Sequence, residues 1–351
     1  MDEIFYDVVD LLKALISTPS VSREEQAAAD IIENFLKARG CTTQRCGNNV
    51  WTIAPGYSHE RPTLLLNSHI DTVRPVDGWT RNPFSPDDGE RIYGLGSNDA
   101  GASVVSLTAA FLLLSQRQQR YNLVFLASCE EEVSGKGGIE AVLPLLPKID
   151  VALVGEPTGM HPAVAEKGLM VLDGEIAGKS GHAARDEGEN AIYKALPMIE
   201  RLRSLSFPLT SAHLGPVKIS VTQISAGTQH NVVPDMCRIV VDVRTTDAYT
   251  NEQTLEMIRQ AVPFCKLTPR SVRLRPSGIS EQHPIVRRLV IAGRKPFGSP
   301  TLSDQALMPF PSLKIGPGDS ARSHTADEYI TYDEIREAIQ IYFTTLDGLA
   351  L

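Results

Sequence analysis

The sequence predicts an α/β fold in which a mixed sheet carries helices on both faces and a second, smaller α+β domain is inserted into the chain. Two observations lead to this prediction. Helix-like and strand-like patterns alternate over the first 160 residues, as they do where crossover helices join the strands of a sheet. From about Gly168 onward, alternating strand patterns dominate. With 351 residues and 42% hydrophobic content, the chain can bury the cores of two domains.

Two helices are expected first. Residues 1–16 combine acidic residues with apolar residues at helical spacing, which favours an amphipathic helix over a basic secretory signal. The pattern Ser22-Arg-Glu-Glu25 predicts a capping box that opens a second helix. Gly40 stands where a C-terminal glycine would end that helix.

Polar side chains follow three short apolar runs that we expect to be buried strands. The length of these runs, and the Pro, Gly and Asn residues around them, favour strand over helix. The runs cover residues 63–66, 123–127 and 151–154. They are followed, in order, by His69 and Asp71, by the acidic run 130–132, and by Glu156. Because ligands of open α/β sheets bind outside the carboxyl ends of the strands, these side chains are expected to converge on one crevice.

The inserted domain is expected to span residues 168–280, which leaves residues 1–167 and 281–351 for the main domain. Strand patterns within the insertion are separated by helix-like stretches in a β-α-β-β-α-β order, which is typical of a ferredoxin-like domain. The strand patterns lie at 171–176, 217–224 and 238–243, and the helix-like stretches lie near 190–205 and 251–261.

Composition excludes several classes of function. The formal net charge of -8 argues against a nucleic acid or an anionic membrane as partner, because both need an excess of Lys and Arg, so a small metabolite fits better. The most apolar stretch, 102–114, contains Ser and Thr and is shorter than the roughly 20 residues of a membrane span. Five cysteines without CxxC spacing indicate neither a disulfide framework nor a cysteine zinc site, so a reducing cytoplasm is the expected location.

His69 and Asp71 form the first pattern with chemical meaning. Two residues apart, they project the same way from an extended chain, so the carboxylate can orient the imidazole for metal binding. The same spacing also occurs in ordinary polar loops. Asp99 lies in a glycine-rich turn before an apolar helix, where it could either bridge two cations or cap the helix.

The acidic run Glu130-Glu131-Glu132 is harder to explain as ordinary surface. Three adjacent carboxylates at the end of a core strand repel one another, and a cation would relieve that repulsion. His182 and His324 lie in loops of small residues, where the backbone can approach a ligand closely.

Taken in order, six motifs resemble the acetylornithine deacetylase and succinyl-diaminopimelate desuccinylase family of co-catalytic zinc aminoacylases and peptidases. The resemblance spans nearly the whole chain and is greatest to the N-acyl-ornithine deacetylases. The motifs are HID at 69–71, GLGSND at 94–99, CEEE at 129–132, VGEPT at 154–158, GKSGHAA at 178–184 and GPGDSARSH at 316–324.

The resemblance implies two metal ions, zinc or cobalt, bound in the main domain. His69, Asp99 and Glu156 would bind one ion, and Asp99 would be shared with a second ion held by Glu132 and His324. Ions about 3.5 to 4 Å apart, held by imidazole and carboxylate, are typical of two-metal hydrolases.

The resemblance also implies roles for residues that are not metal ligands. Asp71 would support His69, Glu131 would be the general base, and His182 would reach the substrate from the partner subunit of a homodimer. The positions that match the family's substrate contacts, or lie near them, are Arg244, Asn231, Arg322 and Lys167. The implied reaction removes a short acyl group, acetyl or succinyl, from an N-acyl amino acid, with N-acylornithine of arginine biosynthesis as the first candidate.

Other functions stay open at this point. A succinyl-diaminopimelate desuccinylase, or a dipeptidase or carboxypeptidase, would use the same metal chemistry, whereas a noncatalytic metal-binding protein would not need Glu131. A hydrolase using Cys129 or Ser128 is disfavoured because neither residue lies in a GxSxG elbow. The family's Asp-x-Lys-Gly turn lacks its lysine here, since Asp99 is followed by Ala100 and Gly101. The acyl group, the amino acid and the native metal are not determined by these patterns.

Overall fold

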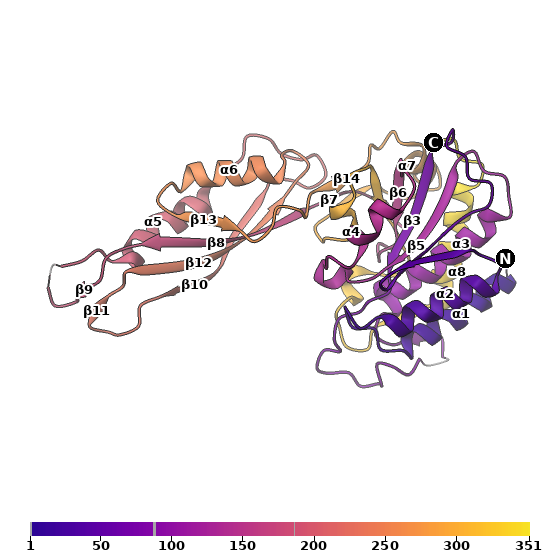
Figure 1. Ribbon diagram of the computed structural model, residues 1–351, viewed down its shortest axis with the longest axis horizontal. Helices are drawn as coiled ribbons and strands as arrows, with labels where there is room; N and C mark the ends of the chain where they lie inside the picture. The colour runs from indigo at the N-terminus through magenta and orange to yellow at the C-terminus, as the bar shows by residue number, and fades with distance from the viewer. Residues whose placement is uncertain (1, 87–88, 186) are drawn as a thin grey trace. The chain divides into compact units, whose positions relative to one another are not determined.

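The computed structural model describes residues 2–86, 89–185 and 187–351. The chain folds into two units, labelled by element in Figure 1. The first unit contains the residues up to Val164 together with Gly278–Phe297 and Ser303–Leu351. The second unit contains Ala165–Ser277 and Gly298–Leu302.

A mixed sheet forms the centre of the first unit, and its strand order is β1-β2-β5-β3-β6-β16-β7-β14, with β15 paired to β7. Strand β3 is parallel to both β5 and β6, and β6 is parallel to β16, whereas β2 is antiparallel to β5. The bounds are β1 Thr43–Cys46, β2 Asn49–Ile53, β3 Thr63–His69, β5 Asn122–Ser128, β6 Val151–Val154, β7 Ala163–Glu166, β14 Ser277–Gly278, β15 Phe297–Ser299 and β16 Ser312–Lys314. The three apolar runs therefore form β3, β5 and β6, as the sequence predicted.

Apolar side chains leave this sheet on both faces. Leu64 and Leu66 of β3 join the larger core cluster with helices α1, α2, α3, α7 and α8, while Leu65 joins a second cluster with α4 on the opposite face. Figure 1 shows α1, α2, α3 and α8 together beside the sheet. The bounds are α1 Asp2–Ile16, α2 Gln26–Ala38, α3 Ala102–Ser115, α4 Ile139–Val142, α7 Pro284–Ile291 and α8 Tyr332–Leu346. The predicted α/β class is confirmed, and among the described residues the short helix α4 is the α-helix that contributes to the cluster on the second face.

Helix α3 is the central helix of the larger layer. Together with the turn before it, α3 gives the segment Ser97–Ser115, 19 residues long, which in the described part of the chain is the one helix long and apolar enough to cross a membrane. Within the protein, 78% of that segment's 18-residue window is buried, and α3 packs against α1, α8 and β3. Its apolar side chains are therefore those of a core helix.

The predicted capping box at the start of the second helix is wrong. The N-cap residue of α2 is Glu25, and no side chain caps the helix there. The Ser22 hydroxyl instead donates to Asp71 Oδ2 at 2.7 Å, and Glu25 Oε1 accepts the backbone N–H of Glu130 at 3.2 Å. Gly40 does follow the helix with φ at +80°, as expected. Local pattern predicted a cap, but tertiary contacts use both side chains elsewhere.

The second unit is a four-stranded antiparallel sheet in the order β10-β12-β8-β13, accompanied by two helices. Alternate residues of β8 are buried, and its Met170 and Leu172 pack in a cluster with residues of α5 and α6. The bounds are β8 Gly168–Ala177, β9 Gly181–His182, α5 Ala191–Ser204, β10 Lys218–Ala226, β11 Val232–Val233, β12 Met236–Thr245, α6 Asn251–Ala261 and β13 Lys266–Pro269. The order of the sheet strands and helices along the chain is β-α-β-β-α-β.

Candidate metal centre

Three neighbouring parallel strands bring the expected polar residues to one edge of the sheet. His69 is the last residue of β3, the acidic run 130–132 follows β5, and Glu156 follows β6. The strands lie in the order β5-β3-β6, so all three carboxyl ends meet. The convergence predicted from sequence follows from this strand order.

His69 is buried with both ring nitrogens facing acceptors. Its Nδ1 lies 3.0 Å from the carbonyl oxygen of Asp71 and 3.5 Å from Asp71 Oδ1. Its Nε2 lies 3.3 Å from Asp99 Oδ1 and 3.7 Å from Glu156 Oε1. One side of the imidazole is thus anchored by Asp71, and the other side is turned toward two carboxylates.

Asp71 anchors more than the histidine. Its carboxylate accepts the backbone N–H of Glu131 at 3.0 Å and of Glu132 at 3.1 Å, in addition to the Ser22 hydroxyl. Burial raises the pKa of Asp71, but the bonds to His69, Ser22 and Glu131 outweigh burial and hold that pKa below its ordinary value. Asp71 therefore stays ionised and ties the end of β3 to the acidic loop after β5.

Asp99 lies between the two candidate metal-binding histidines. Its Oδ1 is 3.3 Å from His69 Nε2, and its Oδ2 is 3.8 Å from His324 Nε2. His324 Nε2 is also 3.0 Å from Glu132 Oε2. The alternative that Asp99 caps the following helix is wrong, because the N-cap residue of α3 is Gly101 and no side chain caps it. Asp99 has the placement of a carboxylate shared by two ions.

Glu131 lies on the His69 and Glu156 side of this centre. One ligand atom each from His69, Glu131 and Glu156 all lie within 4.8 Å of one another, and the same holds for His69, Asp99 and Glu132. Burial raises the pKa of Glu131 well above its ordinary value, and the charges of Glu156, Asp304 and Glu132 add to the effect while His69 opposes it.

The histidines respond to the same concentration of negative charge. Burial opposes protonation of His69, yet its contacts with Asp71 and Asp99 and the charges of Glu156 and Glu131 raise its pKa well above the ordinary value. The bond to Glu132 raises the pKa of His324 to about 9. Protons thus offset part of the carboxylate charge.

Divalent ions would offset the same charge, and the donor set fits them. Two imidazoles and four carboxylates, the nitrogen and oxygen donors that zinc and related ions prefer, lie in contiguous groups at the sheet edge. His69 and Asp99 contribute to the centre of the cluster, and Asp71 supports His69 from behind in the way that carboxylates commonly support metal-binding imidazoles.

Two buried acids beneath the centre were missed by sequence reasoning. Asp304 Oδ2 accepts from Asn67 Nδ2 at 2.9 Å and from the Ser128 hydroxyl at 2.6 Å, so it joins β3 to β5 just below the site. Glu328 accepts backbone N–H groups of the turn that carries Asp99. Glu328 lies four residues after His324 in a segment already singled out, but a contact with a distant backbone leaves no periodic signal in sequence.

The cysteine and serine alternatives find no support in this geometry. Cys129 is buried, and burial together with the charges of Glu25, Glu130 and Asp71 raises the pKa of its thiol. A thiol with a raised pKa is a poor nucleophile at neutral pH. The recorded contacts of the Ser128 hydroxyl are with the carboxylate of Asp304 and the carbonyl oxygen of Ser68. Neither group is a histidine that could act as its base.

Most of the expected substrate residues lie in the second unit. His182 is exposed in β9, where it pairs with Val232 of β11, and the carbonyl of Asn231 accepts the N–H of Ala183 at 3.0 Å. The structure therefore brings His182 and Asn231 together on one two-stranded ribbon.

The charged candidates differ in the contacts that their side chains make within the protein. Arg244 binds Asp242 of its own strand at 3.0 and 3.2 Å. Burial and the charges of Lys218 and Arg244 lower the pKa of Lys167. Arg322, in the first unit, binds both oxygens of Glu334 at 2.9 and 3.1 Å and lies over the ring of Tyr329.

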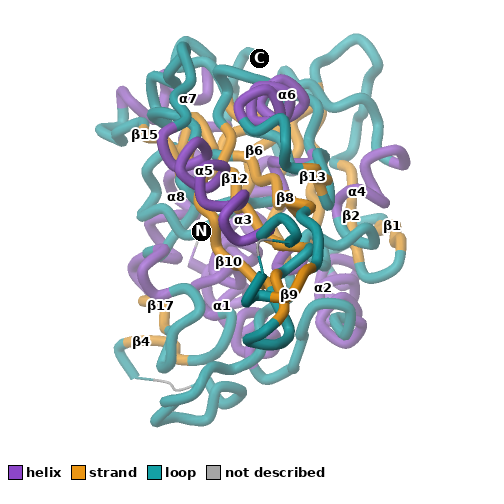
Figure 2. Tube along the Cα trace, turned by 90° about the vertical axis from the view of Figure 1, so that its left-hand side faces the viewer, coloured by secondary structure: helices purple, strands orange, loops and turns teal. Residues whose placement is uncertain are grey.

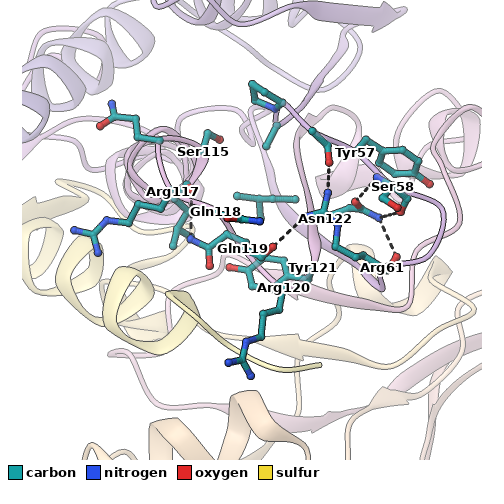
Figure 3. A pocket seen from close by; sticks show the side chains of 16 residues that line it. Tyr57, Ser58, Arg61, Ser115, Arg117, Gln118, Gln119, Arg120, Tyr121 and Asn122 are labelled. Carbon is teal, nitrogen blue, oxygen red and sulfur yellow. Dashed lines mark hydrogen bonds between the residues drawn. The ribbon is translucent and has the colours of Figure 1, made fainter.

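A separate cavity opens at the amino end of β5, far along the strand from the acidic loop (Figure 3). Asn122 Nδ2 donates to the carbonyls of Ser58 and Arg61 there, and Arg61 donates to the carbonyl of Gln119 at 3.0 Å. Figure 3 shows the side chains of Arg117 and Arg120 pointing in different directions. The expected site residues are not among the described residues that line this cavity.

The groups of histidine and carboxylate side chains fit a metal-dependent hydrolase of amide bonds, and comparison with known proteins shows that class. Residues 65–348 match the Peptidase family M20/M25/M40. The chain belongs to this family, which confirms the resemblance drawn from the six motifs.

Relatives and solved structures extend the comparison over nearly the whole chain. A putative succinyl-diaminopimelate desuccinylase DapE of Mycobacterium tuberculosis is 27% identical, with 97% of this chain and 98% of the relative covered. Acetylornithine deacetylase of Klebsiella pneumoniae is 27% identical, with 92% of each chain covered. Aminopeptidase PepT from Bacillus cereus shares the fold with a TM-score of 0.80 at 18% identity, covering 98% of each chain. Bacillus subtilis YXEP, a dinuclear metal-binding peptidase, has a TM-score of 0.76 at 16% identity, covering 99% of this chain and 100% of YXEP.

Proposed function

We propose that this protein removes a short acyl group, acetyl or succinyl, from the amine of an N-acyl amino acid, with N-acylornithine as the first candidate substrate. The observation that carries the proposal is the position of Asp99, with one oxygen 3.3 Å from His69 and the other 3.8 Å from His324. A carboxylate shared between two imidazoles in this way suits two ions that act on one amide bond.

The proposed ligands divide into two sets that share Asp99. His69, Asp99 and Glu156 would hold one ion, and Asp99, Glu132 and His324 would hold the other. The contacts of His69 with Asp99 and Glu156, and of His324 with Asp99 and Glu132, support this division. Zinc is the proposed metal, with cobalt as an alternative, because both accept mixed nitrogen and oxygen donors.

Glu131 is the proposed general base. Bound divalent ions would polarise the acyl carbonyl and make a bound water more acidic. Glu131 would take the proton from that water and later give it to the departing amine, which converts the amide into a carboxylic acid and an amine. Its carboxylate lies within 4.8 Å of a ring nitrogen of His69, and Asp71 holds its backbone N–H at 3.0 Å. Asp71 therefore orients the base and the imidazole together.

His182 is proposed to stabilise the developing oxyanion from the partner subunit of a homodimer. Surface features of the second unit support a dimer: β10 is an edge strand of its sheet, and Ile224 of β10 is 55% exposed. Tyr193 and Leu196 of α5 are also exposed. Exposed strand edges with apolar neighbours are surfaces that a second chain covers.

The acyl and amino-acid groups are proposed to meet the cations of the second unit. Arg244 would bind a substrate carboxylate with both nitrogens of its fork in competition with Asp242. Burial and the charges of Lys218 and Arg244 lower the pKa of Lys167, so a nearby substrate anion would stabilise its charged form. Asn231 would contact the polar part of the substrate. Arg322 is the weakest candidate, because Glu334 already binds its guanidinium.

The cations Lys167, Lys218 and Arg244 favour a succinyl-diaminopimelate desuccinylase as the second candidate function, because its substrate carries several carboxylates. Lys218 and Arg244 are direct neighbours across β10 and β12, and Lys167 precedes β8 in the same sheet. A dicarboxylate would neutralise more of this charge than an acetyl group would.

A substrate panel separates these candidates. N-acetyl and N-succinyl forms of ornithine, lysine and diaminopimelate are assayed beside dipeptides, with zinc or cobalt added. The proposal expects the largest kcat/KM for an N-acyl amino acid, and for an N-acylornithine among them. Hydrolysis of dipeptides alone would replace it with a dipeptidase, and a preference for N-succinyl-diaminopimelate would select the second candidate.

A further inference from the structure

Glu328 accepts hydrogen bonds from most of the backbone N–H groups in the turn that carries Asp99. It lies directly before strand β17 (Tyr329–Thr331) and is 2% exposed. Its Oε2 accepts the N–H of Gly96 at 2.9 Å, and its Oε1 accepts the N–H groups of Asn98 and Asp99 at 2.8 Å each. Its own carbonyl accepts the N–H of Gly94 at 2.9 Å. One residue thus receives four N–H groups from residues 94–99.

The turn needs such a partner because its N–H groups point inward. Gly94 and Gly96 have φ values of +149° and +75°, conformations that glycine adopts readily and other residues do not. These φ values direct successive N–H groups toward a common point, which forms a concave site for an anion. Buried N–H groups without an acceptor are costly, so removing the Glu328 carboxylate would favour another shape of the turn.

A change in this turn would move Asp99. The Asp99 N–H is bound to Glu328, while its carboxylate oxygens face His69 at 3.3 Å and His324 at 3.8 Å. A rotation about the Asp99 backbone would change both distances at once. The ligand that both proposed ions share is therefore the one whose backbone Glu328 fixes.

Two further contacts join this turn to the loop that carries His324. Strand β17 pairs with β4 (Arg91–Tyr93), so the residues before Gly94 and after Glu328 are held side by side (Figure 2). The side chain of Asn98 accepts the N–H of Asp319 at 3.0 Å and donates to its carbonyl at 3.1 Å. Glu328 is central to a clamp between two loops that each supply a candidate ligand.

We propose that Glu328 is a positioning residue that holds Asp99 where both metal ions can share it. The proposal rests on the proposed function, in which Asp99 is the shared ligand. Changes to groups that orient metal ligands typically weaken metal affinity or activity about 10- to 100-fold. Glu328 would therefore set the occupancy of the metal centre without touching metal or substrate.

The test compares Glu328→Gln and Glu328→Asp with the wild type. Glutamine presents an amide N–H₂ to at least one backbone N–H, so a hydrogen bond is replaced by two facing donors. Aspartate keeps the charge but is one methylene too short to reach all three N–H groups. Glu337→Gln is the matched control, because Glu337 lies in the same C-terminal segment and pairs with Arg294 on the surface.

Zinc binding to chelator-stripped protein is measured by titration, and the metal-free Tm of each variant is recorded beside it. We expect Glu328→Gln to lose 10- to 100-fold in affinity for at least one zinc ion, Glu328→Asp to lose less, and the control to match the wild type. Excess zinc should restore kcat with KM unchanged. If Glu328→Gln does not fold, Glu328→Asp decides alone.

The inference would be overturned if a folded Glu328 variant bound both zinc ions as tightly as the wild type does. A lowered metal-free Tm with no change in zinc affinity would overturn it as well. A wild-type protein that binds no zinc or cobalt would instead overturn the proposed function. The two failures are therefore distinguishable in the same titration.

Discussion

The carboxylate of Asp71 accepts the backbone N–H of Glu131 at 3.0 Å. This contact links the two residues that sequence reasoning assigned to different tasks, support of a metal-binding histidine and general base catalysis. The same oxygen, Oδ1, lies 3.5 Å from His69 Nδ1, and the other oxygen, Oδ2, accepts the N–H of Glu132 at 3.1 Å. One buried acid therefore fixes a proposed metal ligand, the proposed base and a second proposed ligand.

Asp71→Asn is expected to lower kcat about 10- to 100-fold with a small change in KM. The asparagine amide would face one of the two backbone N–H groups, which misplaces Glu131 and Glu132. Steady-state kinetics on the best N-acyl amino acid measure the effect. Asp150→Asn is a matched control, because Asp150 makes the same kind of bond, to the N–H of Thr63 at 2.9 Å, at the opposite end of β3. Equal losses in both variants would show a general effect on the sheet.

Acid is expected to remove the contribution of Glu334 to stability. Burial raises the pKa of Glu334, but Arg322 and Thr331 outweigh it and hold that pKa below its ordinary value. A group with a depressed folded pKa stabilises the fold above its unfolded pKa of roughly 4.3, and this stabilisation is lost as the pH falls through the folded pKa.

The variant Glu334→Gln tests the direction of this pH dependence of stability. Glutamine can still form the capping box with Thr331 but loses the ion pair with Arg322. Thermal unfolding should show a lower Tm for the variant at pH 7 and a shrinking difference from the wild type below about pH 4.3. A difference that grows toward acid would contradict the assignment.

Ile224→Lys is expected to convert a dimer into monomers. The substitution places a charge on the exposed edge strand β10, which opposes pairing with a second chain. Sedimentation velocity reports the mass, and a fall in kcat should accompany dissociation if His182 acts across the interface. Phe264→Lys is the control, because Phe264 is 74% exposed between α6 and β13, beside the opposite edge of the sheet. A fully active wild-type monomer would contradict the role of His182.

Metal removal is expected to abolish activity and lower Tm. Without ions, the carboxylates of the centre repel one another, and a ligand that binds only the folded state stabilises it by about 2.7 kcal/mol at a concentration of 100 times its Kd. Activity and Tm are measured after chelation and again after addition of zinc or cobalt. Full activity in the stripped protein would favour a nucleophilic hydrolase.

The sequence predicted the candidate site where metal-binding residue types directly follow predicted strands. The apolar runs and the residues after them placed His69, the acidic run and Glu156 at one sheet edge, because adjacent parallel strands bring their ends together. The motif order indicated the family, and the comparisons confirm it. Domain boundaries and the roles of individual site residues stay predictions.

Contacts between distant segments were beyond sequence reasoning. Ser22 and Glu25 fit a capping box locally, but Ser22 binds Asp71 and Glu25 binds Glu130 across the fold. Glu328 and Asp304 were missed because their partners are distant in sequence: Asp99 lies 229 residues from Glu328, and Asn67 lies 237 residues from Asp304. Tertiary hydrogen bonds of this kind follow no spacing rule within a segment.

Glu131→Gln provides the most direct test of the central claim, that a two-metal centre hydrolyses an acyl amide with Glu131 as base. Metal content and kcat are measured together on the purified variant and on the wild type, with the same N-acyl amino acid. We expect two ions in both proteins and a loss of kcat of about 10²- to 10⁴-fold in the variant. A variant that keeps its two ions and turns over at the wild-type rate would contradict it.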